Sequence, residues 1–169
     1  MQRARRLIGM DVRTPAGKRL GEVCDVLIDH PLRRVVGIVV NAGSLRRKPC
    51  YVRRKDIVAI DATYITVRSD RSLETNLIGG YGLSSAASPL GKEIERQGVG
   101  DLGHIRDVLV DTKRLTIWGF EISDGLVSDV LNGVTKVPRR EVKRLMGRLL
   151  WASHHDSGSD LHNGSDSHE

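Results

Sequence analysis

The chain is poor in aromatic residues, which make up 4% of it, and it holds only two cysteines, Cys24 and Cys50. Neither cysteine has the spacing of a C-x-x-C motif or a zinc site, so we expect two reduced, buried thiols, with a structural disulfide as the alternative. No run approaches the roughly 18 apolar residues of a transmembrane helix, and the basic N-terminus lacks the apolar core of a signal peptide. These absences predict a cytoplasmic protein.

The motifs of common enzyme classes are also missing. Gly79-Gly80-Tyr81-Gly82 lacks the Lys-Ser/Thr that completes a phosphate-binding loop, and no Gly-x-Ser-x-Gly elbow occurs. Four of the six histidines lie near the end of the chain: His154, His155, His162 and His168. A tail of this composition offers no preformed metal geometry. We therefore expect a non-enzymatic protein with no cofactor and no metal.

The net charge of +6 is unevenly distributed. Residues 1–60 hold 14 Lys/Arg against 5 Asp/Glu, whereas residues 61–138 hold 8 against 11. This asymmetry predicts either an anionic partner for the first part or attraction between the two parts. The candidate anion- or partner-binding residues form two basic clusters: Arg46, Arg47 and Lys48, and Arg53, Arg54 and Lys55.

An internal repeat determines the expected architecture. With an offset of 82 residues, Leu20–Asp29 falls on Leu102–Asp111. At this offset, the residues of 7–40 that are identical in the second copy are Gly9, Leu20, Gly21, Asp25, Val26, Leu27, Asp29 and Gly37. Three extra residues then enter the second copy, after which Val52–Ile57 aligns with Val137–Val142. The chain therefore reads as two copies of one small unit.

Each copy has the pattern of β-strands. Short runs of Val, Ile and Leu are bounded by Gly, Pro and Asp, and Pro15–Lys18 is typical of a tight turn. The apolar phase slips between Val23 and Val26, which predicts a β-bulge that lets the sheet curl. Asp25 and its equivalent Asp107 lie at this slip, and we expect their carboxylates to bind free backbone N–H groups there.

These residues resemble the PRC-barrel family, which is named for the cytoplasmic domain of the photosynthetic reaction centre H subunit and includes the C-terminal domain of the ribosome maturation factor RimM. The shared pattern is the Leu-Gly-x-Val-x-Asp-Val-x-Ile-Asp motif at Leu20–Asp29 and Leu102–Asp111, with a closing Val137-Pro138 in the second copy. Arg53 replaces that proline in the first copy. The resemblance implies one small six-stranded barrel per copy and a role in docking or assembly.

One helix is expected near the C-terminus, from Pro138 to Ala152. Its apolar residues have helical spacing: Val142, Leu145, Met146, Leu149 and Leu150. This stripe is the candidate helix interface. It could pack on a barrel, be exchanged in a homodimer, or bind an anionic membrane surface as a basic amphipathic helix.

The predicted fold is mainly β, with two PRC-type barrels in tandem and a C-terminal amphipathic helix. The predicted segments are a first barrel over 1–69, a linker over 70–88, a second barrel with its helix over 89–152, and a disordered tail over 153–169.

The expected function is that of an adaptor that docks on a protein complex. The alternative is an RNA- or ribosome-associated factor that uses the basic first barrel, although so few aromatic residues offer little stacking for single-stranded bases.

Overall fold

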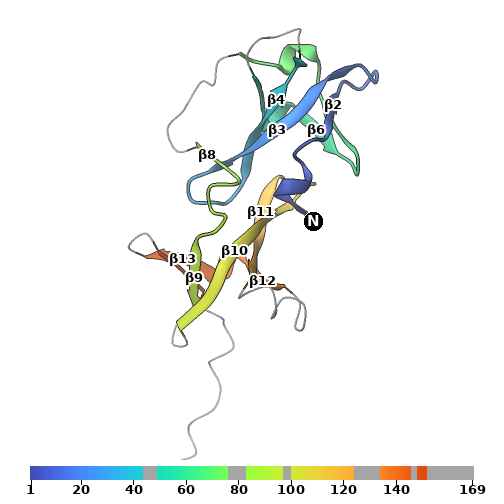
Figure 1. Ribbon diagram of the computed structural model, residues 1–169. Helices are drawn as coiled ribbons and strands as arrows, with labels where there is room; N and C mark the ends of the chain where they lie inside the picture. Colours follow the sequence, from blue (N-terminus) through green and yellow to red (C-terminus); the bar gives the residue numbers. More distant parts are fainter. Residues whose placement is uncertain (44–48, 76–82, 97–99, 124–133, 146–147, 152–169) are drawn as a thin grey trace, which may run out of the picture.

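Two β-sheets follow one another along the chain in the computed structural model (Figure 1). The structure describes residues 1–43, 49–75, 83–96, 100–123, 134–145 and 148–151. The first sheet is built from β2 (Asp11–Arg13), β3 (Arg19–Asp29), β4 (Val35–Asn41), β5 (Cys50–Arg53), β6 (Ile57–Ile60) and β7 (Tyr64–Val67). The second is built from β9 (Glu93–Arg96), β10 (Gly100–Asp111), β11 (Thr116–Ser123), β12 (Thr135–Pro138), β13 (Val142–Leu145) and β14 (Arg148–Trp151).

Shorter elements connect these strands. The two remaining strands are β1 (Gln2–Arg3) and β8 (Leu83–Ser85). The 3-10 turns are η1 (Ala4–Arg6), η3 (Arg54–Asp56), η4 (Asp70–Ser72) and η5 (Arg139–Glu141). The predicted mainly β fold is confirmed.

The two sheets have the same topology. Their strand orders are β5-β4-β3-β2-β7-β6 and β12-β11-β10-β9-β14-β13. In each sheet one neighbouring pair is parallel, β2 with β7 and β9 with β14, and the other neighbours on the path are antiparallel. The sequence repeat is therefore also a repeat of strand pairing.

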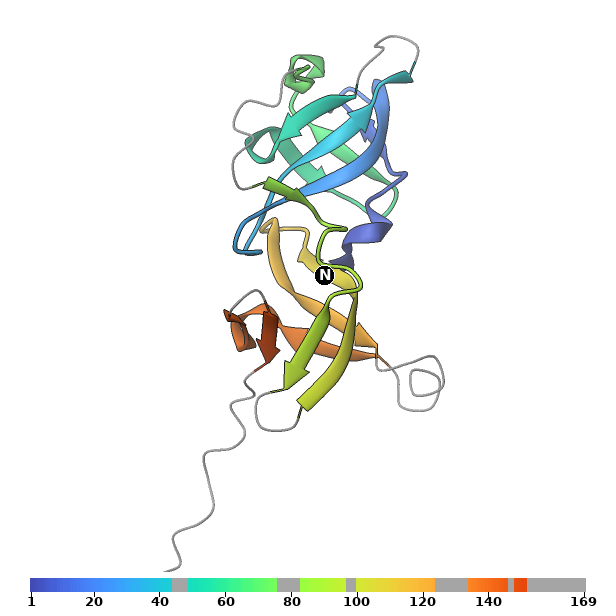
Figure 2. The same ribbon diagram turned by 60° about the vertical axis from the view of Figure 1, so that its left-hand side comes forward.

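Each sheet receives its seventh strand from the other copy. β1 pairs with β10, with Gln2 opposite Val110, whereas β8 pairs with β3, with Ser84 opposite Ile28. Gln2 and Ser84 are 82 residues apart, and so are Ile28 and Val110, so the two exchanges are equivalent. Figure 2 shows β8 alongside the first sheet and the N-terminus beside the second. β8 lies within the segment that we predicted as a linker.

The repeated aspartates lie at equivalent bulges. The register of β3 against β4 shifts between Val23 and Asp25, and that of β10 against β11 shifts before Asp107. Asp25 accepts a hydrogen bond from the N–H of Val26, at 2.7 Å, and Asp107 accepts one from the following residue at 2.8 Å. The predicted bulge and its carboxylate acceptor are both confirmed.

Two repeated glycines let neighbouring strands approach closely. A Cβ on Gly37 would lie 2.4 Å from the Val52 carbonyl oxygen and 2.4 Å from the Tyr51 ring. A Cβ on Gly119 would lie 2.1 Å from the Val137 carbonyl oxygen. This explains why glycine recurs at this position of β4 and β11.

The predicted burial of the two cysteines is half right. Cys24 and Cys50 form no disulfide with each other, but Cys24 is exposed and Cys50 is buried. Because side chains alternate along β3, Cys24 faces away from the core that contains its neighbour Val23, which is 1% exposed.

The predicted C-terminal helix is wrong. Residues 142–145 and 148–151 are the strands β13 and β14, which pair with each other, and β14 also pairs with β9. Leu145 and Leu150 lie in these strands, Met146 is outside the described residues, and Val142 and Leu149 are buried at 4% and 6% exposure. Apolar residues three and four positions apart are compatible with two short strands as well as with one helix. Here β9, the parallel neighbour of β14, supplies hydrogen-bond partners for the backbone of that strand. The dimer and membrane roles that we gave to the helix lose their basis with it.

Candidate functional site: a basic seam between the sheets

The turns between β3 and β4 and between β10 and β11 meet at a seam. The N–H of Val35 donates to the Leu115 carbonyl at 3.0 Å, and the N–H of Ile117 donates to the Arg33 carbonyl at 2.8 Å. Val35 and Ile117 are equivalent in the repeat, and so are Arg33 and Leu115. The two sheets thus meet through a reciprocal contact, in which each contributes the same positions as the other.

Two equivalent arginines reinforce this seam. Arg54 donates through Nη2 to the Arg114 carbonyl at 2.5 Å. Arg139 donates through Nη2 to the Pro31 carbonyl at 2.7 Å and through Nε to the Leu32 carbonyl at 3.1 Å. Each arginine follows the closing strand of its own sheet and reaches the turn of the other one, so both act as clamps.

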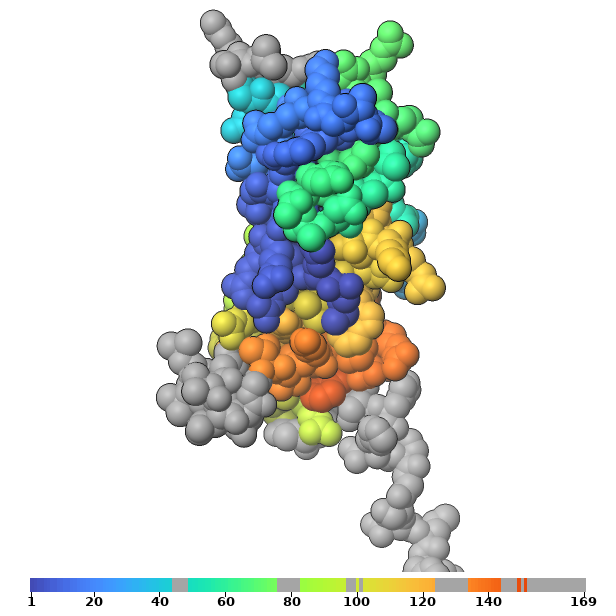
Figure 3. Space-filling view, turned by 90° about the vertical axis from the view of Figure 1, so that its right-hand side faces the viewer, coloured from blue at the N-terminus to red at the C-terminus, as the bar shows by residue number. Residues whose placement is uncertain are grey.

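The N-terminal segment is held by two buried carboxylates of the second sheet. The Nε of Arg3 donates to Oε2 of Glu121 at 2.8 Å, and the Nε of Arg5 lies 2.6 Å from Oδ2 of Asp107 as an ion pair without hydrogen-bond geometry. Asp107 and Glu121 are 1% and 2% exposed. Figure 3 shows the blue N-terminal residues against the yellow and orange surface of the second sheet. Burial raises the pKa of the Asp107 carboxyl, although the Val108 N–H and Arg5 oppose that shift.

The first sheet holds β8 through a hydrogen bond to the equivalent aspartate, Asp25. The hydroxyl of Ser85 donates to Oδ1 of Asp25 at 2.7 Å. Ser85 is equivalent to Arg3, and Asp25 to Asp107. Asp25 thus contacts the exchanged strand β8, and Asp107 contacts Arg5 in η1, directly after the exchanged strand β1.

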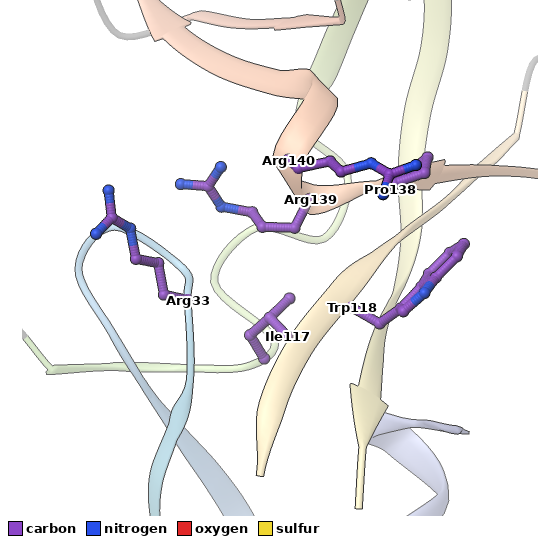
Figure 4. Close-up of a pocket in the computed structure, with 6 residues that line it drawn as sticks. All are labelled: Arg33, Ile117, Trp118, Pro138, Arg139 and Arg140. Carbon is purple, nitrogen blue, oxygen red and sulfur yellow. The ribbon is translucent and has the colours of Figure 1, made fainter. Parts of the chain in front are cut away.

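A hollow of about 530 Å³ opens beside the seam. We call it the seam hollow, and its lining residues are Arg33, Ile117, Trp118, Pro138, Arg139 and Arg140. Figure 4 shows Arg33 on the turn of the first sheet at one side of the hollow, with Trp118 and Arg140 on the opposite side. Trp118 is 40% exposed, although it lies in the middle of β11.

The three arginines of the seam hollow differ in their availability. Arg139 is committed to backbone carbonyls, and burial lowers its pKa, with the nearby Arg33 adding to that effect. The side chain of Arg140 is 82% exposed and lies 3.5 Å from Glu141. Arg33 is exposed, and among the described residues no hydrogen bond or ion pair of its guanidinium is seen. Arg33 therefore presents positive charge on one side of the seam hollow, and Arg140 and the exposed indole of Trp118 lie on the other side.

Of the two predicted basic clusters, the structure describes the second, Arg53, Arg54 and Lys55. Arg46, Arg47 and Lys48 fall outside the described residues. Arg53 forms an ion pair with Glu74 at 2.8 Å, Arg54 is a clamp of the seam, and Lys55 is exposed. Their role in anion binding stays a prediction.

Sequence reasoning missed Trp118. The repeat alignment places it opposite Val36, so one of the few aromatic residues replaces an ordinary strand residue. That substitution was a usable signal. Its meaning depended on the exposure of the indole and on the arginines around it, which come from other parts of the chain.

Within the described ranges, no group of three or more His, Cys, Asp or Glu residues is placed to hold a metal ion. The same part of the chain contains no helix with the length and hydrophobicity needed to cross a bilayer.

Comparison with known families gives one match, to the PRC-barrel domain over residues 1–74. This range contains all six main strands of the first sheet together with β1. This part of the chain is therefore similar to a PRC-barrel domain. The resemblance seen in the sequence motifs is confirmed for this part, and the PRC-barrel is a non-catalytic domain family. No curated protein matches the chain.

Proposed function

We propose that this chain is a non-enzymatic adaptor that docks on a protein complex in the cytoplasm through the seam hollow. The single observation that carries the proposal is the 40% exposure of Trp118 inside a hollow lined by arginines. Tryptophan and arginine are the residue types most enriched at the energetic centres of protein interfaces. A non-catalytic domain family and carboxylates committed to strand exchange agree with binding rather than with chemistry.

The proposal includes a second PRC-barrel in residues 89–151. Its support is the strand order, which repeats that of the matched domain, together with the equivalent bulges and close-approach glycines. In this view the adaptor is a pair of barrels joined by exchanged strands, and the seam between them is its binding surface.

The alternative is an RNA- or ribosome-associated role, which the basic N-terminal part favours. Several arginines are however already paired with acids: Arg34 with Asp29 at 3.1 Å and Arg53 with Glu74 at 2.8 Å. Nonspecific single-strand binding relies on successive aromatic platforms along a basic groove, whereas the seam hollow offers one indole.

A pull-down with the tagged full chain tests the proposal. Lysate is treated with nuclease or left untreated, captured proteins are identified, and each is then purified and rebound. We expect rebinding to the parent and to a Val36→Ala control at the equivalent position, but not to Trp118→Ala. Capture that disappears with nuclease would favour the RNA role, and equal rebinding to Trp118→Ala would exclude the seam hollow.

A further inference from the structure

The repeat separates residues that hold the sheets together from residues that do not. Arg54 and Arg139 are shared between the two copies, and both cross the seam. Trp118 has no counterpart of its kind, because the equivalent position is Val36. A structure built from two equal halves therefore does not require an indole at this place.

Arg33 breaks the symmetry in the same way. Its equivalent is Leu115, which is buried at 8% exposure, whereas Arg33 is exposed at the rim of the seam hollow. The backbone of both residues serves the reciprocal seam contact, so the seam does not explain the guanidinium of Arg33. Two unshared side chains, one cationic and one aromatic, thus line the same hollow.

Arg140 adds a third feature. It is equivalent to Lys55, and its charge is only loosely engaged at 3.5 Å from Glu141, whose Oε2 already accepts a hydrogen bond from the Trp151 indole at 2.9 Å. Arg140 and Arg33 can each bind a carboxylate in the forked geometry that guanidinium groups favour. Trp118, on the same side of the hollow as Arg140, offers an apolar surface to a nearby side chain.

We propose that the seam hollow binds an acidic segment of a partner protein, with carboxylates on Arg33 and Arg140 and an apolar side chain against Trp118. The inference rests on the proposed docking function and specifies its partner. Neighbouring arginines paired with acids, such as Arg114 at 3.7 Å from Asp111, break up any continuous basic path for a phosphate backbone. A short segment that carries two carboxylates and one apolar side chain matches Arg33, Arg140 and Trp118.

Fluorescence anisotropy with synthetic probes tests this inference on the full chain. The first probe is a labelled peptide of aspartate and glutamate with one central leucine, and the second replaces the acids by asparagine and glutamine. A single-stranded RNA of the same length is the third. We expect saturable binding of the acidic peptide alone, weakening as salt rises because the contacts are charged.

Matched variants locate the binding. Arg33→Ala and Arg140→Ala should each weaken the acidic peptide about tenfold, the size of effect expected when a residue worth more than about 1 kcal/mol is removed from an interface. Lys55→Ala, at the position equivalent to Arg140, should change the affinity much less. Binding of the acidic peptide should change the tryptophan emission of the parent, and Trp118→Phe should abolish that change. These side chains are exposed, so thermal melting should remain near that of the parent.

The remaining outcomes overturn the inference. Equal binding of the neutral peptide, or no binding of the acidic one, excludes an acidic segment as the partner. RNA binding that depends on Arg33 and Arg140 without peptide binding assigns the hollow to nucleic acid. If the pull-down still identifies a protein that requires Trp118, the docking function stands and only the acidic partner is rejected.

Discussion

Arg54 and Arg139 stand at equivalent positions, directly after β5 and β12, and the guanidinium of each donates to a carbonyl in the turn of the opposite sheet. Arg139 makes more hydrogen bonds, since it donates to both Pro31 and Leu32 of that turn, and its Nη1 also donates to the Val142 carbonyl of its own sheet at 3.0 Å. The relationship shows that the two copies are joined by a contact that the repeat itself encodes.

The unequal bonding of these arginines predicts unequal effects on stability. Arg139→Ala should lower the free energy of unfolding by about 2 kcal/mol, because a charged donor leaves several carbonyls without partners. Arg54→Ala should cost less than about 1 kcal/mol, since it removes one exposed bond. Urea denaturation measures both, with Lys55→Ala as a control of nearly parental stability. Equal losses for the two arginines would contradict this account of the seam.

The contribution of the Arg3–Glu121 ion pair to stability can be tested by installing the residues found at the equivalent positions of the other copy. Arg3→Ser should destabilise the chain by about 2 kcal/mol, less than a fully buried pair would lose, because Arg3 is partly exposed while Glu121 is left in the interior. The double variant Arg3→Ser, Glu121→Val installs the residue types of Ser85 and Val39, and we expect it to recover most of the loss. Chemical denaturation of the two variants decides the matter; a double variant as unstable as the single one would show that the charge pair is not the cause.

The raised pKa of Asp107 predicts a dependence of stability on pH. Because the folded state holds this proton more tightly than the unfolded chain does, the contribution of Asp107 to stability falls as pH rises from about 4, the usual pKa of Asp, through the higher folded value. In Asp107→Asn this titration is absent, so the stability of the variant relative to the parent should improve over that range. Denaturation curves recorded at several pH values measure the difference, in which other groups cancel. A relative stability that declines with pH would mean that attraction to Arg5 outweighs burial.

The close approach at Gly119 predicts a steric cost. Gly119→Ala should lower the free energy of unfolding by about 3 kcal/mol, since the new methyl group meets the Val137 carbonyl and forces β11 and β12 apart. Gly43→Ala is a suitable control because open space surrounds it, and its positive φ of 66° alone should cost about 1–2 kcal/mol. A thermal melt of Gly119→Ala at or above that of the control would refute the steric explanation.

The repeat made much of the fold predictable, because equal residues at equal spacing form equal bulges and turns. Asp25 and Asp107 could be placed at bulges from the slip in apolar phase alone. The helix predicted over residues 142–151 was wrong because that prediction rested on local apolar spacing and not on the repeat. The repeat places this segment opposite β6 and β7, which pair as antiparallel strands in the first copy, as β13 and β14 do in the second.

The candidate site was less accessible to sequence reasoning. Arg33, Trp118 and Arg140 are far apart in the chain and follow no motif, so their proximity depends on how the turns of the two sheets meet. Conversely, Arg53 and Arg54 look like a basic cluster in the sequence, yet one is paired with an acid and the other with a carbonyl.

The sequence by itself determined the repeat, the strand content and the positions of the bulges, because these follow from local pattern and repetition. Only the tertiary structure decided that β1 and β8 cross to the opposite sheets and that a hollow forms beside Trp118. The local sequence does not reveal this exchange, because the pairings of Gln2 with Val110 and of Ser84 with Ile28 join segments that are far apart in the chain. The choice between the two depends on buried partners such as Glu121, which are close to Arg3 in space and distant in the chain.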